Sequence, residues 1–258
     1  MDRVVKKILQ LYILTAQKLE QFVGLSQFHN RNKCYKVLTF FLWFIIKTFF
    51  VVIYPISCFR VLSFFSAKDS ETRVYSRNIT FAFNWLLLVF LYIVSFDNFH
   101  RGFSEIKRWF NQLIKIQSLK QNLNFLVWCL SKIIVSAYMI KMNYSKYVRR
   151  SQKNLEVWEH YLMFFLLIPY IAFALTSNRI FVANTVVNGF LKEIENNIKS
   201  NVFNDFQRIK LCTLKYGRLF DFYKNFNETN SFHLLAVLSF CMLNIVYEVC
   251  NMDLFDGS

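Results

Sequence analysis

The sequence predicts an all-α membrane protein: a polytopic transmembrane helix bundle of about five spans, with amphipathic cytoplasmic helices. Three observations support this fold class. Hydrophobic residues occupy 55% of the 258 positions and charged residues only 18%, whereas soluble domains carry about 25% charged residues. Only 5 glycines and 2 prolines are available for turns. Long apolar runs recur, and most Lys and Arg residues fall between them, as expected where lipid is part of the solvent.

Five apolar runs account for the predicted spans. An α-helix rises about 1.5 Å per residue, so about 20 residues cross the hydrocarbon core of a bilayer. Backbone hydrogen bonds must close internally in lipid, and the runs show no alternating pattern, so each is predicted to be a helix. The runs are Val37 to Phe59, Thr80 to Phe96, Phe125 to Met142, Tyr161 to Ser177 and Phe232 to Cys250.

The distribution of basic residues predicts the orientation of the bundle. Residues 1–36, 97–124 and 178–231 together contain 20 Lys and Arg, whereas residues 60–79 and 143–160 together contain 8. Cytoplasmic segments of membrane proteins carry the excess of positive charge. The N-terminus is therefore predicted to be cytoplasmic.

Two segments outside the spans repeat apolar residues at helical spacing. Near the N-terminus the repeat predicts an amphipathic helix on the inner membrane face, and its apolar positions are Val5, Ile8, Leu9, Tyr12, Ala16, Leu19 and Val23. In residues 191–231 the repeat predicts one or two amphipathic helices that project from the membrane and pack on protein.

The chain therefore divides into four parts. They are a cytoplasmic N-terminal amphipathic segment (1–36), a four-span bundle (37–190), a cytoplasmic amphipathic helical segment (191–231), and the fifth span with a short tail (232–258).

No motif in the sequence predicts an enzyme. The four histidines are scattered, the six cysteines form no CxxC pair, and no phosphate-binding loop or nucleophile motif is present, so neither a cofactor nor a metal ion is expected. The net charge is +15, but the basic residues are spread along the chain and form no block of five or six. This distribution is typical of basic residues at the ends of membrane helices, and it argues against a surface that binds nucleic acid.

Three charged residues fall inside the predicted spans: Lys47, Lys132 and Glu248. Charges at this depth are costly and often mark a pathway for ions or substrates, which would fit a small transporter. The alternative is that the two lysines snorkel or face polar atoms within the bundle, and that Glu248 lies at the membrane interface.

Aromatic and polar residues in the spans are candidates for binding a small organic ligand, because such a site needs an apolar cleft with a few polar groups. The alternative is an aromatic belt at the interface together with ordinary helix packing. The candidates are Trp85, Tyr138, Tyr161, Tyr170, Asn244 and Tyr247.

Three stretches resemble the insect gustatory receptor family, the seven-span chemoreceptors related to insect odorant receptors. QKLEQFVGLSQFHNRNKCYKV (17–37) is similar to the family's cytoplasmic lead-in to the first span. NTVVNGFLKEIENNI (184–198) is similar to the stretch where the fourth helix runs into the cytoplasm. LKYGRLFDFYKNFNETNSFHLLAVLSFCMLNIVYEV (214–249) resembles an amphipathic helix, a short break with asparagines, and then the fifth span.

The resemblance implies a function in taste. Members of this family form tetrameric ligand-gated cation channels in the plasma membrane, with a ligand pocket in the outer half of the bundle. The expected partners are membrane lipid, a small-molecule tastant, and either copies of this chain or full-length receptor subunits. The family's Thr-Tyr and Gln-Phe motif of the pore-lining seventh span has no match here. The chain is therefore expected to be truncated after its fifth span and not to conduct alone. The alternative is a non-conducting partner subunit of full-length receptors.

Overall fold

The fold consists of long α-helices, and every regular element among the described residues is helical. The computed structural model describes residues 1–25, 33–65, 71–151, 161, 165–200 and 206–252. The helices are α1 (Asp2–Phe22), α2 (Lys33–Phe65), α3 (Glu71–Ile116), α4 (Leu119–Ser151), α6 (Ile168–Ser200) and α7 (Phe206–Met252). The all-α fold class predicted from the sequence is thereby confirmed.

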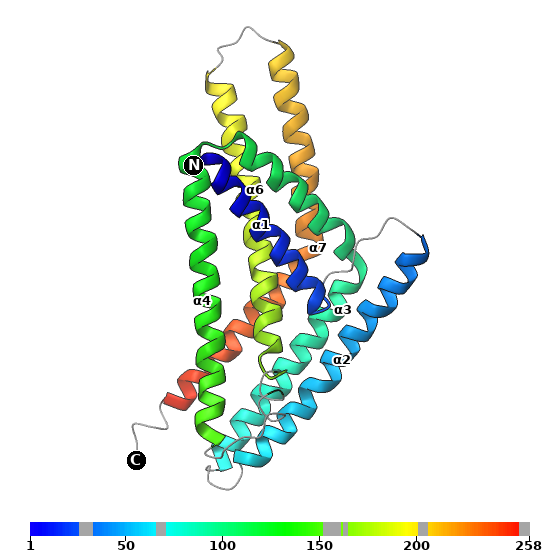
Figure 1. Cartoon of the computed structure of the whole chain (residues 1–258), viewed down its shortest axis with the longest axis vertical. Helices are drawn as coiled ribbons and strands as arrows, with labels where there is room; N and C mark the ends of the chain where they lie inside the picture. The colour runs from blue at the N-terminus through cyan, green and yellow to red at the C-terminus, as the bar shows by residue number, and fades with distance from the viewer. Residues whose placement is uncertain (26–32, 66–70, 152–160, 162–164, 201–205, 253–258) are drawn as a thin grey trace.

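Consecutive helices from α2 onward run in alternating directions along the long axis of the molecule (Figure 1). The N-terminus, the α3–α4 junction and the facing ends of α6 and α7 lie toward the upper end in this view, whereas α7 ends at the lower end. Helix α1 crosses the bundle obliquely and contacts α3, α4 and α6.

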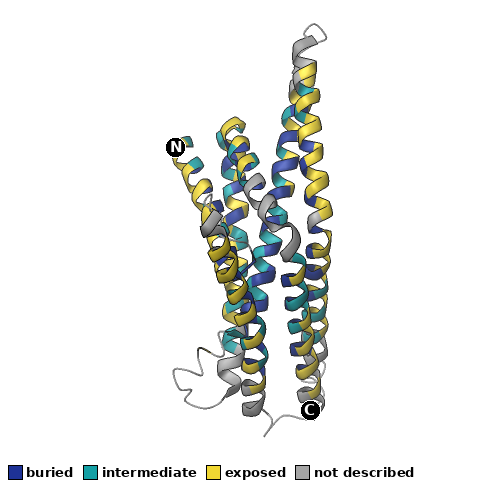
Figure 2. Ribbon diagram, turned by 90° about the vertical axis from the view of Figure 1, so that its right-hand side faces the viewer, coloured by how far each residue is buried: buried dark blue, intermediate teal, exposed yellow. Residues whose placement is uncertain are grey.

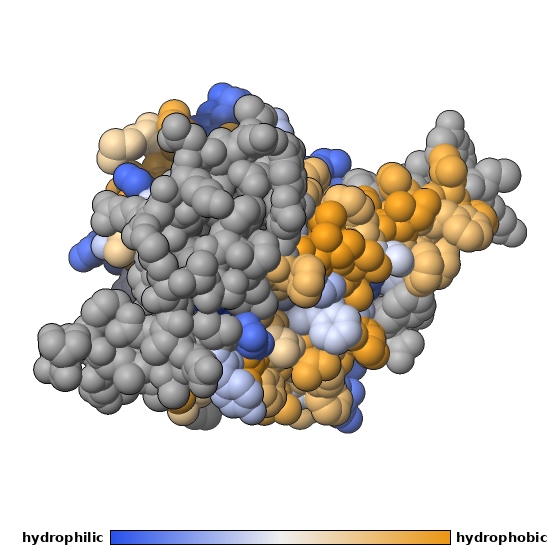
Figure 3. All heavy atoms as spheres, turned by 90° about the horizontal axis from the view of Figure 1, so that it is seen from below, coloured by the Kyte–Doolittle hydropathy of each residue, from blue (hydrophilic) through white to orange (hydrophobic). Residues whose placement is uncertain are grey.

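Four helices contain segments that are long and apolar enough to cross a membrane: Phe40–Phe59, Arg77–Val94, Leu119–Met142 and Asn230–Tyr247. Most residues of these segments are not buried within the protein, and in α4 only 11% are. Exposed positions follow the outer faces of the helices (Figure 2), and apolar side chains gather on the described part of the lower surface (Figure 3). Apolar surface on this scale is typical of helices that are embedded in a membrane or packed on further protein.

The fourth predicted run, Tyr161 to Ser177, lies partly outside the described residues, and α6 begins at Ile168 within it. Five spans therefore stay a prediction, with four of them represented by apolar helices in the structure.

Two apolar clusters form the interior. The upper core joins α1, the second half of α3, the start of α4, the middle of α6 and the first half of α7; it includes Leu9, Ile13, Phe110, Leu113, Val186, Phe190, Leu219 and Phe222. The lower core joins the segment after α1 with α2, α3, α6 and α7; it includes Leu25, Phe50, Leu88, Leu91, Phe173, Ala236 and Phe240.

Helix α1 packs on protein through part of the face that the sequence assigned to the membrane. Val5, Leu9 and Ile13 are buried in the upper core, and Ile13 was not among the predicted positions. Ile8 and Leu19 are among the predicted apolar positions, but their side chains are 43% and 46% exposed. Apolar periodicity alone does not separate a face that meets protein from one that meets lipid, because both require the same residues.

The break expected before the last span is wrong, because α7 is one helix of 47 residues. Its sequence contains neither glycine nor proline between Arg218 and Met252. Asn230, in the middle of the expected break, donates its side-chain N–H to the carbonyl of Phe226 one turn earlier, at 2.8 Å. The asparagine is thereby satisfied without a turn.

Candidate functional site

Two of the predicted ligand-binding residues meet between α6 and α7. The hydroxyl of Tyr170 donates a hydrogen bond of 2.8 Å to Asn244 Oδ1, and Asn244 Nδ2 donates to the carbonyl of Phe240 at 2.7 Å. The ring of Phe240 stacks on Phe173 with centroids 4.2 Å apart and meets Tyr170 edge-on at 5.1 Å. This Tyr170–Asn244 site places a polar pair among aromatic rings, and side chains of both kinds are common in the lining of small-molecule sites.

The other four predicted residues lie elsewhere. Trp85 donates its indole N–H to the carbonyl of Val51 at 2.9 Å and ties α3 to α2. Tyr138 is 59% exposed on α4, and Tyr161 is also exposed. Tyr247 is half-buried on α7, one turn beyond Asn244. The structure therefore does not bring all six side chains together.

Lys47, although buried in the first span, has well-defined partners. Its ammonium group donates a hydrogen bond of 2.9 Å to the carbonyl of Tyr92 and lies 3.7 Å from the centre of the Trp43 ring. Tyr92 in turn donates its hydroxyl to the carbonyl of Val23 at 2.8 Å. Gly24, with φ of +75°, lets the chain turn sharply here. Lys47 thus helps to hold the end of α1 against α2 and α3.

The two lysines inside the predicted spans have separate surroundings in the structure. The ammonium of Lys132 lies 3.9 Å from the centre of the Phe181 ring, between α4 and α6. This contact and those of Lys47 share no residue. Glu248 belongs to α7, and its side chain is outside the described part of the structure. A cation placed over an aromatic face is stabilised without an ion pair.

A buried polar layer that sequence reasoning missed joins α1, α6 and α7. It consists of Glu20, Arg179, Asn230 and His233, each at most 6% exposed. Arg179 Nη2 donates a hydrogen bond of 2.9 Å to Asn230 Oδ1, and Glu20 attracts Arg179 electrostatically. We name these four residues the polar layer. The position of Glu20, one turn after the buried Ala16, was the available signal, because it places a carboxylate on the apolar face of α1.

The charged groups of the polar layer have perturbed acidities. Burial raises the pKa of Glu20 to about 7, although the positive charge of Arg179 opposes this rise. Burial likewise lowers the pKa of Arg179 to about 10, against the attraction of Glu20. Both shifts follow from the cost of keeping a charge away from water. The pair is therefore ionised at pH 8, and Glu20 becomes protonated in mild acid.

We expect the two charged groups to be energetically coupled. Arg179→Met leaves the Glu20 carboxylate buried without its counter-charge and should lower the free energy of unfolding by about 3–5 kcal/mol. Glu20→Leu should cost less, because burial already disfavours the ionised carboxylate at pH 8. The double variant should cost at least about 1 kcal/mol less than the sum. Thermal or denaturant unfolding in detergent at pH 8 measures the cycle, and strictly additive effects would contradict the coupling.

Stability should also depend on pH through Glu20. Its folded-state pKa is about 7 against 4.5 for the free side chain. The folded state therefore holds the proton more tightly, and this contribution is complete below about pH 4.5 and lost as the pH rises through 7. We expect a loss of roughly 3 kcal/mol across this window. Glu20→Gln should flatten the profile, and equal slopes in the two proteins would contradict the assignment.

Comparisons of the chain with protein-family models, with curated proteins and with solved structures find no match.

Proposed function

We propose that this chain is a chemoreceptor polypeptide of the insect gustatory receptor type, in the class of ligand-gated cation channels for taste detection. The proposal places it in the plasma membrane with a cytoplasmic N-terminus. The observation that carries it is the course of α6 and α7, which continue unbroken from the lower core into an extension closed by the upper core. The sequence resemblance implies that the fourth helix runs into the cytoplasm over residues 184–198 and that an amphipathic helix precedes the fifth span within residues 214–249, although the short break it also implies is absent from α7.

Side-chain packing supports this extension as a folded unit. The ring of Trp109 on α3 meets Phe190 of α6 edge-on, with centroids 5.1 Å apart, and lies 5.9 Å from the ring of Phe222 on α7. Phe190 and Phe222 are both buried. Three helices thus share an aromatic contact in the part that the charge distribution assigns to the cytoplasm.

The Tyr170–Asn244 site supports the sensory part of the proposal. It lies in the lower half of the bundle, on the opposite side of the polar layer from the N-terminal helix. With a cytoplasmic N-terminus this half faces outward, where a tastant would arrive. The Tyr170 hydroxyl and the Asn244 amide would supply orientation, and the rings of Phe173 and Phe240 would supply apolar contact.

Electrical recording tests the proposal. Expressed alone, the 258 residues should give no tastant-evoked cation current, since none of them matches the family's pore-lining motif. Co-expressed with full-length gustatory receptor subunits, the chain should change the amplitude or concentration dependence of their current. Tyr170→Phe, which removes the hydroxyl bound to Asn244, should alter that effect. Robust currents from the chain alone, or receptor currents that it leaves unchanged, would contradict the proposal.

A second candidate function is that of a non-conducting partner subunit, and an exposed aromatic stripe on α7 favours it. Tyr216, Phe220 and Tyr223 are 50%, 53% and 38% exposed at intervals of four and three residues, and the first two rings stack at 6.4 Å. They occupy one helical face beside the buried Phe222. Exposed aromatic residues of this kind are typical of interface cores.

This stripe should govern association with full-length receptor subunits. Phe220→Asp places a charge in the stripe and should reduce co-purification from membranes at least about tenfold, because a desolvated charge opposes an apolar interface. Leu214→Asp is the matched control, since Leu214 is similarly exposed at 54% but lies on another face of α7. Phe222 would be unsuitable, because it is buried in the upper core. Equal recovery of both variants and wild type would exclude the stripe as the interface.

A further inference from the structure

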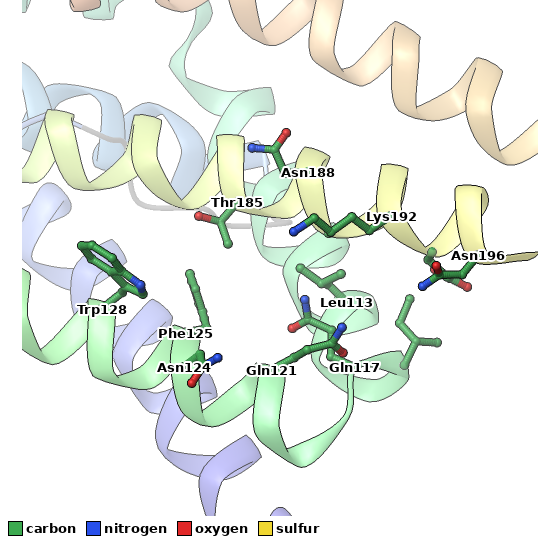
Figure 4. Close-up of a pocket in the computed structure, with 13 residues that line it drawn as sticks. Leu113, Gln117, Gln121, Asn124, Phe125, Trp128, Thr185, Asn188, Lys192 and Asn196 are labelled. Carbon is green, nitrogen blue, oxygen red and sulfur yellow. The ribbon is translucent and has the colours of Figure 1, made fainter.

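A pocket lined by both polar and apolar side chains lies between the end of α3, the first turns of α4 and the second half of α6 (Figure 4). Its volume is about 340 Å³, within the range of small-ligand sites. Its α6 wall begins at Thr185, about four helical turns beyond Tyr170. The pocket is therefore separate from the Tyr170–Asn244 site.

Local packing fixes the walls of the pocket. Gly189 lets α6 approach α3 closely, because a Cβ atom there would lie 2.7 Å from the Leu113 side chain. A capping box starts α4: the Ser118 N–H donates to Gln121 Oε1 at 2.9 Å, and the Gln121 N–H donates to Ser118 Oγ at 3.4 Å. Asn122 then donates to the carbonyl of Ile114 at 3.2 Å and closes the corner between the helices.

The lining of the pocket contains one cation and two buried acceptor atoms without a hydrogen-bond partner among the described residues. Lys192 runs back along α6 with its ammonium end toward the pocket (Figure 4). The two acceptors are Gln117 Oε1 and Glu193 Oε2. The other oxygen of Glu193 pairs with Lys215 at 3.4 Å, so the acidic charge is partly balanced. A fitting ligand would carry an anionic group for Lys192 and an N–H donor for the two acceptors.

The pocket opens onto the surface of α4 that meets lipid. Trp128 lines the pocket and is 60% exposed. Val135 and Met139, seven and eleven residues further along the helix, continue the same face and are also exposed. Because this apolar segment starts at Leu119, the pocket lies at the end of the span, where lipid headgroups are located.

We propose that this pocket binds the headgroup of an aminophospholipid, which carries a phosphate and a primary ammonium group. Lys192 pairs with the phosphate, and the ammonium donates hydrogen bonds to Gln117 and Glu193. The acyl chains follow the face of α4 that contains Trp128. The site depends on membrane embedding alone and not on the proposed function.

Native mass spectrometry of the full chain in mild detergent tests the proposal. Phosphatidylethanolamine should bind at least about fivefold more tightly than phosphatidylcholine, whose quaternary ammonium has no N–H, and than phosphatidylglycerol, which has no ammonium. Lys192→Met should weaken phosphatidylethanolamine binding about tenfold. Gln117→Leu, which leaves only the Glu193 acceptor, should reduce the preference over phosphatidylglycerol. Lys199→Met is the control, because Lys199 is exposed on α6 outside the pocket and pairs with Glu195.

Several results would overturn the site. These are equal affinity for the three lipids, a Lys192→Met effect no larger than that of Lys199→Met, or an unchanged preference in Gln117→Leu. Soluble phosphoethanolamine that competes at the same concentration as the lipid would exclude a contribution from the acyl chains. Circular dichroism of each variant establishes that it is folded. Failure of the chain to alter receptor currents would overturn the proposed function and leave these binding results unaffected.

Discussion

The buried hydrogen bond from Arg179 on α6 to Asn230 on α7, with the carboxylate of Glu20 from α1 also buried in the polar layer, is the constraint on which the arrangement of these helices depends. On α6 and α7 the polar layer lies between residues of the upper core and residues of the lower core, and Glu20 lies between Ile13 of the upper core and Val23 of the lower core, just beyond the end of α1. A buried charge that loses its partner is strongly destabilising. Sliding α1, α6 or α7 by one turn would separate these groups, so the polar layer fixes their register.

The polar layer also lies where the exposed surface of α7 changes from polar to apolar. The apolar segment of α7 begins at Asn230. On the side of the C-terminus, α7 exposes apolar residues such as Leu234 and Leu238, whereas on the other side it exposes charged residues such as Lys224 and Glu228. The groups that hold α1 in place therefore lie where the bundle leaves lipid. A second anchor, from Lys47 through Tyr92 to the backbone after α1, lies on the apolar side.

Much of the fold could be predicted from the sequence, because a membrane span is a property of one segment. The predicted run from Val37 to Phe59 contains the apolar segment Phe40–Phe59, and the run from Thr80 to Phe96 nearly coincides with Arg77–Val94. The expected break before the last span failed, since asparagine favours turns only where no tertiary contact competes. Asn230 binds Arg179 and its own helix instead.

The candidate sites were less predictable, because they join side chains across helices. Tyr170 and Asn244 could each be selected as a polar residue in a span, but only the packing of α6 on α7 pairs them. The sequence by itself determined the helical class and the division of the chain between lipid and water, since both follow from the hydropathy of consecutive residues. Tertiary structure alone decided which buried polar groups meet, because that depends on helix register and rotation, which the spacing along one helix does not specify.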